Sequence, residues 1–184
     1  SGKFGKCYKK FFIFLWKTTE EKRIIGDSKS RTASARPILT NIRGMPMIFY
    51  FSATGNSKYV AEHLAAATDD HTIFLRDAIR GRRYQFDASR EKRIGFVMPT
   101  YFFGVPSIVT FFLEKLRLKG YEGQYVYLVL TCGASTGGAG GQMDRLLEDC
   151  GLKLNARFSV PMVDNYVPLG QIPDQEARER KLDA

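Results

Sequence analysis

Short apolar runs that alternate with helix-like stretches constrain the fold of this chain more than any other feature of its sequence. The apolar runs cover residues 47–52, 93–99 and 125–131, with further strands expected at 72–75 and 153–160. Helices are expected at 57–68, 106–118, 140–150 and 174–184, and residues 76–92 are predicted to form a surface connection. Strands that alternate with helices through short connections predict an α/β domain, in which helices cover both faces of a parallel sheet.

The positive charge is concentrated at one end of the chain. Residues 1–46 contain eleven Lys or Arg against three acidic residues, whereas 47–184 contain 17 basic and 16 acidic residues. The nearly neutral second part argues against nucleic-acid binding by the whole protein. We therefore predict a basic, poorly ordered N-terminal extension (1–46) and a folded domain (47–184) whose C-terminal part is expected to be incomplete. The basic and aromatic cluster at 7–16 has an alternative interpretation as a membrane-surface anchor.

Cysteine is scarce, with Cys7, Cys132 and Cys150 and no C-x-x-C pair. A disulfide framework, a zinc site or an iron–sulfur cluster within these residues is poorly supported, and no metal site is expected. The composition fits a reducing, cytoplasmic setting.

One loop has the composition of a phosphate site. In folds of this kind ligands bind beyond the carboxyl ends of the strands, near the point where the chain reverses its direction along the sheet. The loop after the first strand opens a helix, whose free N–H groups favour an anion, and four of its residues carry hydroxyl or amide groups. Its sequence is Ser52-Ala53-Thr54-Gly55-Asn56-Ser57. Gly55 removes a side chain and permits positive φ. The triphosphate and dinucleotide glycine motifs are both absent. The alternative is that Ser and Thr only cap the helix.

Residues 49–57 resemble the flavodoxin phosphate loop, whose pattern is [ST]-x-T-G-N-[ST]. The resemblance covers about residues 47–175 and is greatest to bacterial flavodoxin domains that precede a ferredoxin-type domain, a similarity that the segment 162–169 shares. It implies a flavodoxin-like three-layer sandwich with a five-stranded parallel sheet in the order 2-1-3-4-5. It also implies that Ser52, Thr54, Asn56 and Ser57, with nearby backbone amides, hold the phosphate of FMN. Two departures are the absence of cluster cysteines and of the acidic charge that flavodoxins usually carry.

Two further loops match the flavin-ring loops of that family. The second loop combines aromatic residues with a glycine, and Tyr101 or Phe102 is the candidate for contact with the ring; it reads Pro99-Thr100-Tyr101-Phe102-Phe103-Gly104. The third is rich in glycine after a hydrophobic strand, and begins Thr131-Cys132-Gly133. Aromatic rings offer stacking surface and glycines offer backbone N–H groups. The alternatives are ordinary core aromatics and a flexible turn, and Cys132 is expected to be a bystander rather than a nucleophile.

These features predict an FMN-binding electron-transfer domain without a catalytic residue of its own. An NAD(P)H-dependent FMN or quinone reductase on the same fold is the first alternative, although no residue identifies a nicotinamide site. A flavin-free interaction module with a basic tail is the second. Redox partner proteins, including an iron–sulfur domain, are the expected partners, and neither nucleic acid nor membrane contact is favoured.

Overall fold

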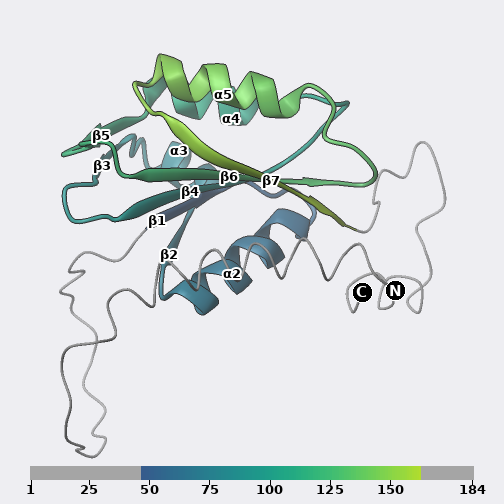
Figure 1. Cartoon of the computed structure of the whole chain (residues 1–184), viewed down its shortest axis with the longest axis horizontal. Helices are drawn as coiled ribbons and strands as arrows, with labels where there is room; N and C mark the ends of the chain where they lie inside the picture. The colour runs from purple at the N-terminus through teal and green to yellow at the C-terminus, as the bar shows by residue number, and fades with distance from the viewer. Residues whose placement is uncertain (1–46, 163–184) are drawn as a thin grey trace, which may run out of the picture. The chain divides into compact units, whose positions relative to one another are not determined.

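The computed structural model describes residues 47–162, which form a parallel β-sheet between helices (Figure 1). Its five strands are β1 (Met47–Tyr50), β2 (His71–Phe74), β4 (Arg93–Pro99), β6 (Tyr125–Cys132) and β7 (Leu154–Pro161). All neighbours pair in parallel, in the order β2-β1-β4-β6-β7. Numbered by their own sequence order, these strands lie 2-1-3-4-5, so the predicted fold class is confirmed.

Helices cover both faces of this sheet. Helix α2 (Asn56–Thr68) lies on one side, and α4 (Ser107–Lys115) and α5 (Ala139–Asp149) lie on the other (Figure 1). The short helix α3 (Leu75–Arg80) contributes to the same hydrophobic cluster as α4 and α5. None of the helices within residues 47–162 has the length and apolar character that a bilayer crossing requires.

Alternation along the strands divides the core into two layers, since successive side chains point to opposite faces of a sheet. Phe49, Phe96 and Phe112 lie in the layer between the sheet and α3–α5, where the rings of Phe49 and Phe96 stack with centroids 5.3 Å apart. On the opposite face α2 buries Val60 and Leu64. Both faces of the central strands are therefore apolar, which explains why these strands read as continuous hydrophobic runs.

Two sequence predictions are wrong. Residues 76–92 are not only a connection, because they contain most of α3 and the strand β3 (Gln85–Asp87). The helix expected at 106–118 ends at Lys115, and Arg117–Lys119 forms β5, which pairs in parallel with β3 in a separate two-stranded sheet. Each of these strands has three residues and one partly buried side chain, Phe86 or Leu118, so neither carries a periodic signal of its own.

The other predicted elements are confirmed within one or two residues. Helix α5 ends as predicted before Gly151, which has φ +77° and donates its N–H to Glu148 O. The helix expected at 174–184 and nearly all of the segment 162–169 lie outside the described residues.

Candidate functional site

The carboxyl ends of β1 and β4 meet at the point where the chain reverses direction along the sheet. From β1 the chain moves outward to β2 and then returns past β1 to β4, so the connections leave these two neighbouring strands in opposite directions. In open α/β sheets, ligands bind in the crevice that this arrangement creates. The first two predicted loops follow these two strands, and the third follows β6 beside them.

The first loop brings an uncapped helix terminus to this crevice. The N-cap residue of α2 makes no side-chain capping hydrogen bond. The N-cap residue is Gly55, with φ +107°, and a Cβ at this position would meet no atom within 4 Å. The glycine is therefore required by backbone conformation, and the space beside it is open.

Two of the loop's hydroxyl groups have defined structural partners. The Gly55 N–H donates to Ser52 Oγ at 3.1 Å, which leaves the Ser52 O–H able to donate elsewhere. Ser57 Oγ lies 2.8 Å from Thr131 Oγ1, and both residues are almost completely buried. This second contact joins the start of α2 to the end of β6. Ala53, Thr54 and Gly55 are exposed. The buried hydroxyls of Ser57 and Thr131 thus hold the loop in position, whereas residues 52–55 form the part of the loop that a ligand can reach.

The second loop is a tight turn in an unusual conformation. Tyr101 and Gly104 exchange two backbone hydrogen bonds, of 3.0 and 2.9 Å, and both residues between them have positive φ, 48° for Phe102 and 61° for Phe103. Such mirror-image turns normally hold Asn and Gly. Left-handed conformations cost about 1–3 kcal/mol at each non-glycine residue, and they persist where the surroundings over-determine them. Both rings are nevertheless directed outward, with Phe102 78% and Phe103 65% exposed.

Contacts with the third loop hold this turn in place. A Cβ on Gly137 would lie 2.4 Å from the Cβ of Phe103, so the two loops touch through a position that only glycine can occupy. The side chain of Gln142, in the first turn of α5, accepts a hydrogen bond from the Val105 N–H at 2.9 Å. Sequence reasoning missed Gln142, which has no local signal, and singled out Gly137 only as one of many glycines.

The remaining predicted residues divide into buried and accessible ones. Pro99 is buried at the end of β4, and Cys132 is 8% exposed at the end of β6. The Thr100 N–H donates to Thr131 O, but its Oγ1 is buried with no hydrogen-bond partner in the described part of the chain. Gly133 is exposed. Tyr101 is 42% exposed, and partial burial raises the pKa of its hydroxyl, so the ring stays neutral at physiological pH.

The structure thus brings the three predicted loops together. The ring of Tyr101 meets that of Phe51, the residue after β1, edge to face at 6.5 Å. None of the segments 51–57, 99–106 and 131–142 contains a charged residue. The site is therefore a neutral crevice with an uncapped helix terminus at one side and aromatic rings at another. Such a surface suits a ligand that combines an anionic group with a flat ring system.

No protein-family model matches the chain, and no curated protein matches its sequence. Among solved structures, the chain is similar to a protein from Bacteroides uniformis ATCC 8492 that is assigned as a flavoprotein. That match has a TM-score of 0.50 and 15% identity, and it covers 77% of this chain and 99% of the other. Rubredoxin oxygen:oxidoreductase from Desulfovibrio gigas matches with a TM-score of 0.50 and 18% identity, over 77% of this chain and 38% of the other. The fold is flavodoxin-like.

A flavodoxin from Streptococcus pneumoniae TIGR4 matches less well, with a TM-score of 0.45, 17% identity and coverage of 76% and 93%. The flavodoxin-like assignment rests on the strand order and on the two structures with the higher TM-score. At these identities the comparison concerns the fold alone.

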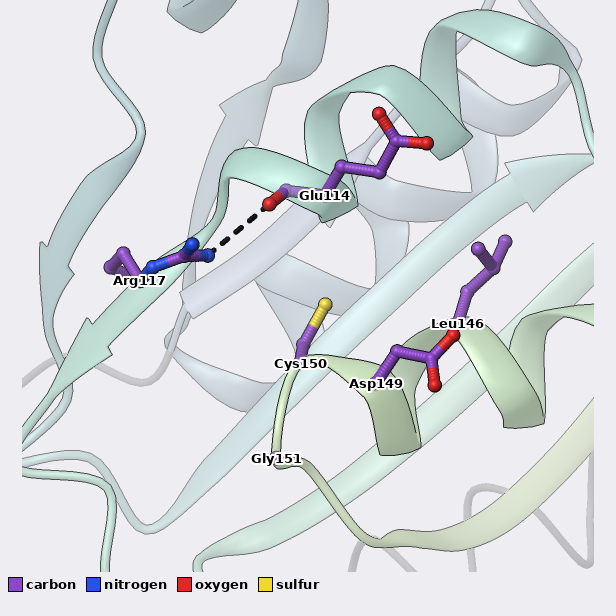
Figure 2. A pocket seen from close by; sticks show the side chains of 6 residues that line it. All are labelled: Glu114, Arg117, Leu146, Asp149, Cys150 and Gly151. Atoms are coloured by element: carbon purple, nitrogen blue, oxygen red, sulfur yellow. Dashed lines mark hydrogen bonds between the residues drawn. The ribbon is translucent and has the colours of Figure 1, made fainter.

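A pocket of about 560 Å³ lies elsewhere, between the C-terminal ends of α4 and α5 (Figure 2). It is lined by Glu114, Arg117, Leu146, Asp149, Cys150 and Gly151. The Arg117 guanidinium donates to Glu114 O at 3.2 Å. Helices of a parallel α/β sheet run opposite to the strands, so this pocket faces away from the three loops and is not part of the candidate site.

Proposed function

We propose that the three loops bind FMN and that the domain transfers electrons through it. The observation that carries this proposal is the N-terminus of α2, which has no side-chain cap within the described residues and has open space beside Gly55. Free N–H groups at a helix N-terminus, together with the helix dipole, form an anion site. The flavoprotein from Bacteroides uniformis, which has the same fold, adds support for a flavin as the ligand.

The residues of the crevice fit the parts of FMN. Backbone amides of residues 54, 56 and 57, with the hydroxyls of Ser52 and Thr54 and the side-chain amide of Asn56, would hold the phosphate. The ring of Tyr101 and the exposed Phe102 offer faces for the isoalloxazine. The unpartnered Oγ1 of Thr100 and the N–H groups at Gly133 could meet its polar edge.

Each of the three loops then has a physical task. Neutral donors hold the phosphate without a counter-charge, and the Ser57–Thr131 contact keeps α2 in register with β6. The Phe103–Gly137 contact fixes the aromatic turn. When bound, FMN supplies one- and two-electron redox chemistry, which the protein tunes through stacking and hydrogen bonds. A cytoplasmic location, inferred from the few cysteines, fits such a domain.

A visible absorption spectrum after incubation with FMN and gel filtration tests the proposal. We expect flavin bands to remain with the protein, and colourless protein would refute it. Rapid mixing of the loaded protein with NADPH distinguishes a carrier from a reductase. Flavin bleaching within the mixing time would identify a reductase, whereas an unchanged spectrum would support a carrier.

A matched pair of glycine variants tests the phosphate assignment. Gly55→Ala and Gly123→Ala introduce the same side chain at positive φ, +107° and +90°, and neither Cβ meets a protein atom within 4 Å. Both should be destabilised by about 1–3 kcal/mol. Only Gly55→Ala should weaken FMN, and it should weaken FMN more than riboflavin, which lacks the phosphate. Equal losses of both flavins would place the phosphate elsewhere.

A further inference from the structure

The surface around α3, β3 and β5 carries most of the positive charge of the described domain. Ten of the 14 basic residues between positions 47 and 162 fall within 76–119, together with only four of the 11 acidic residues. Nine of these ten cations are exposed, and five of the nine define what we term the basic face: Arg80, Arg82, Arg83, Lys115 and Lys119. A single-sign cluster of this kind attracts an anionic partner.

Backbone pairing brings these cations together from segments some thirty residues apart in sequence. The Arg117 N–H donates to Tyr84 O at 2.8 Å, and the Ala88 N–H donates to Lys119 O at 2.7 Å. Both bonds extend the pairing of β3 with β5. Arg82 and Arg83 therefore lie at one end of this small sheet and Lys119 at the other.

Ion pairs do not account for these charges. The ion pairs within the described residues are Lys58–Glu62, Arg76–Asp77 and Arg93–Asp70, and none of them includes a residue of the basic face. Arg80 and Lys115 occupy the last turns of α3 and α4, where the helix dipole favours a cation. The effect of the helix dipole does not reach beyond the last turn. It therefore does not explain the positions of Arg82, Arg83 and Lys119. Arg117 is set apart, because its guanidinium bonds the carbonyls of Glu114 and Leu116.

Aromatic rings lie between these cations. Lys115 Nζ lies 4.9 Å from the ring centroid of Phe111, which is 43% exposed. Arg83 Cζ lies 5.0 Å from the ring centroid of Phe86, also within cation–π distance. Tyr84 meets Phe111 edge to face at 6.4 Å. A cation therefore already covers one face of Phe111 and one face of Phe86, which leaves less ring surface for stacking a nucleobase. Cations that alternate with aromatic side chains are instead typical of surfaces that contact lipid headgroups.

We propose that the basic face docks the domain on a membrane surface that contains anionic phospholipids. Arg82, Arg83 and Lys119 contact the headgroup phosphates, and the rings of Phe111 and Tyr84 lie at the headgroup level. The basic and aromatic cluster at residues 7–16 has the same chemistry in the sequence. This proposal is independent of flavin binding.

Vesicle co-sedimentation of the full chain tests the proposal with variants matched in charge. Arg83→Gln/Lys119→Gln neutralises two cations of the basic face. Arg145→Gln/Lys153→Gln neutralises two exposed cations, one in the middle of α5 and one just beyond its C-terminal end. Both variants keep residues 1–46, so the N-terminal segment contributes equally. On phosphatidylcholine vesicles with about one-third phosphatidylglycerol, we expect the first variant to bind about 30-fold more weakly than the parent and the second to bind almost as well.

Three results would overturn the proposal. The parent chain could fail to bind the anionic vesicles, or bind them no better than pure phosphatidylcholine. The two variants could lose the same affinity, which would assign binding to net charge or to the N-terminal segment. Finally, the basic-face variant could lose affinity for a single-stranded oligonucleotide while it kept its affinity for vesicles, which would make the face a nucleic-acid site. As a control, both variants should unfold thermally at the same midpoint temperature as the parent, which would show that folded proteins are being compared.

Discussion

Replacing Glu91 with Gln should remove a pH-dependent loss of stability from this domain. Glu91 precedes β4 and is only 9% exposed, and its Oε2 has no hydrogen-bond partner within the described residues. Burial, with smaller effects from the carboxylates of Asp70 and Asp87, raises the pKa of Glu91 from its usual 4.5 to about 7. A buried carboxyl group without a counter-charge favours its neutral form.

The sign of the effect follows from proton binding. Between about pH 4.5 and pH 7 the folded chain holds a proton on Glu91 that the unfolded chain has released, so the free energy of unfolding falls as the pH rises. Each pKa unit corresponds to about 1.4 kcal/mol, which gives an upper bound of about 3 kcal/mol for the full loss. Because residual water and local relaxation reduce this bound, we expect a loss of about 1–3 kcal/mol above pH 7.

Urea unfolding of the parent and of Glu91→Gln between about pH 5 and pH 8 measures this loss. The two proteins should be similar at the acidic end, and the variant should be more stable at the alkaline end. Glu122→Gln makes the same chemical change at an exposed position nearby and should follow the parent. Parallel stability curves for the parent and Glu91→Gln, or a less stable variant at pH 8, would refute the argument.

Further predictions concern the site. Gly137→Val should force the turn at Phe103 to move, since the new Cβ would lie 2.4 Å from the Cβ of Phe103. The binding of riboflavin and of FMN should weaken alike. An unchanged Kd for riboflavin would show that the turn does not contact the flavin ring. Thr131→Val should lower the free energy of unfolding by about 1–3 kcal/mol, because it leaves the buried Ser57 hydroxyl unpaired; thermal or urea unfolding measures this. Raising NaCl from about 50 to about 500 mM should change the FMN Kd less than about threefold, because the loops hold no charged side chain; a steep dependence in a fluorescence titration would contradict the neutral site.

The aromatic turn illustrates where local reasoning ends. The sequence Tyr101-Phe102-Phe103-Gly104 indicated aromatic rings near a ligand, and the structure places it at the predicted crevice. Nothing local favours positive φ at two phenylalanines, since this turn type normally selects Asn and Gly. The conformation is held by contacts with Gly137 and Gln142, more than thirty residues away.

Cross-chain contacts also explain residues that the sequence left without a reason. Gly95 interrupts an otherwise bulky strand because a Cβ there would lie 2.5 Å from the phenol ring of Tyr127 on β6. Asp70 and Arg93 form an ion pair of 2.6 Å between the end of α2 and the start of β4. Such partners depend on the strand order, which a local pattern does not contain.

The sequence by itself determined the main layers of this domain and the position of its candidate site. Strands β1, β4 and β6 are buried on both faces, so they had to be continuous apolar runs, and the glycine that opens α2 had to adopt a conformation that other residues resist. Tertiary structure decided the rest. The short strands β3 and β5 exist only because each completes the other's hydrogen bonds, and the Ser57–Thr131 contact joins residues 74 positions apart. Local patterns report burial and backbone preference, whereas pairings of this kind depend on which surfaces the folded chain brings together.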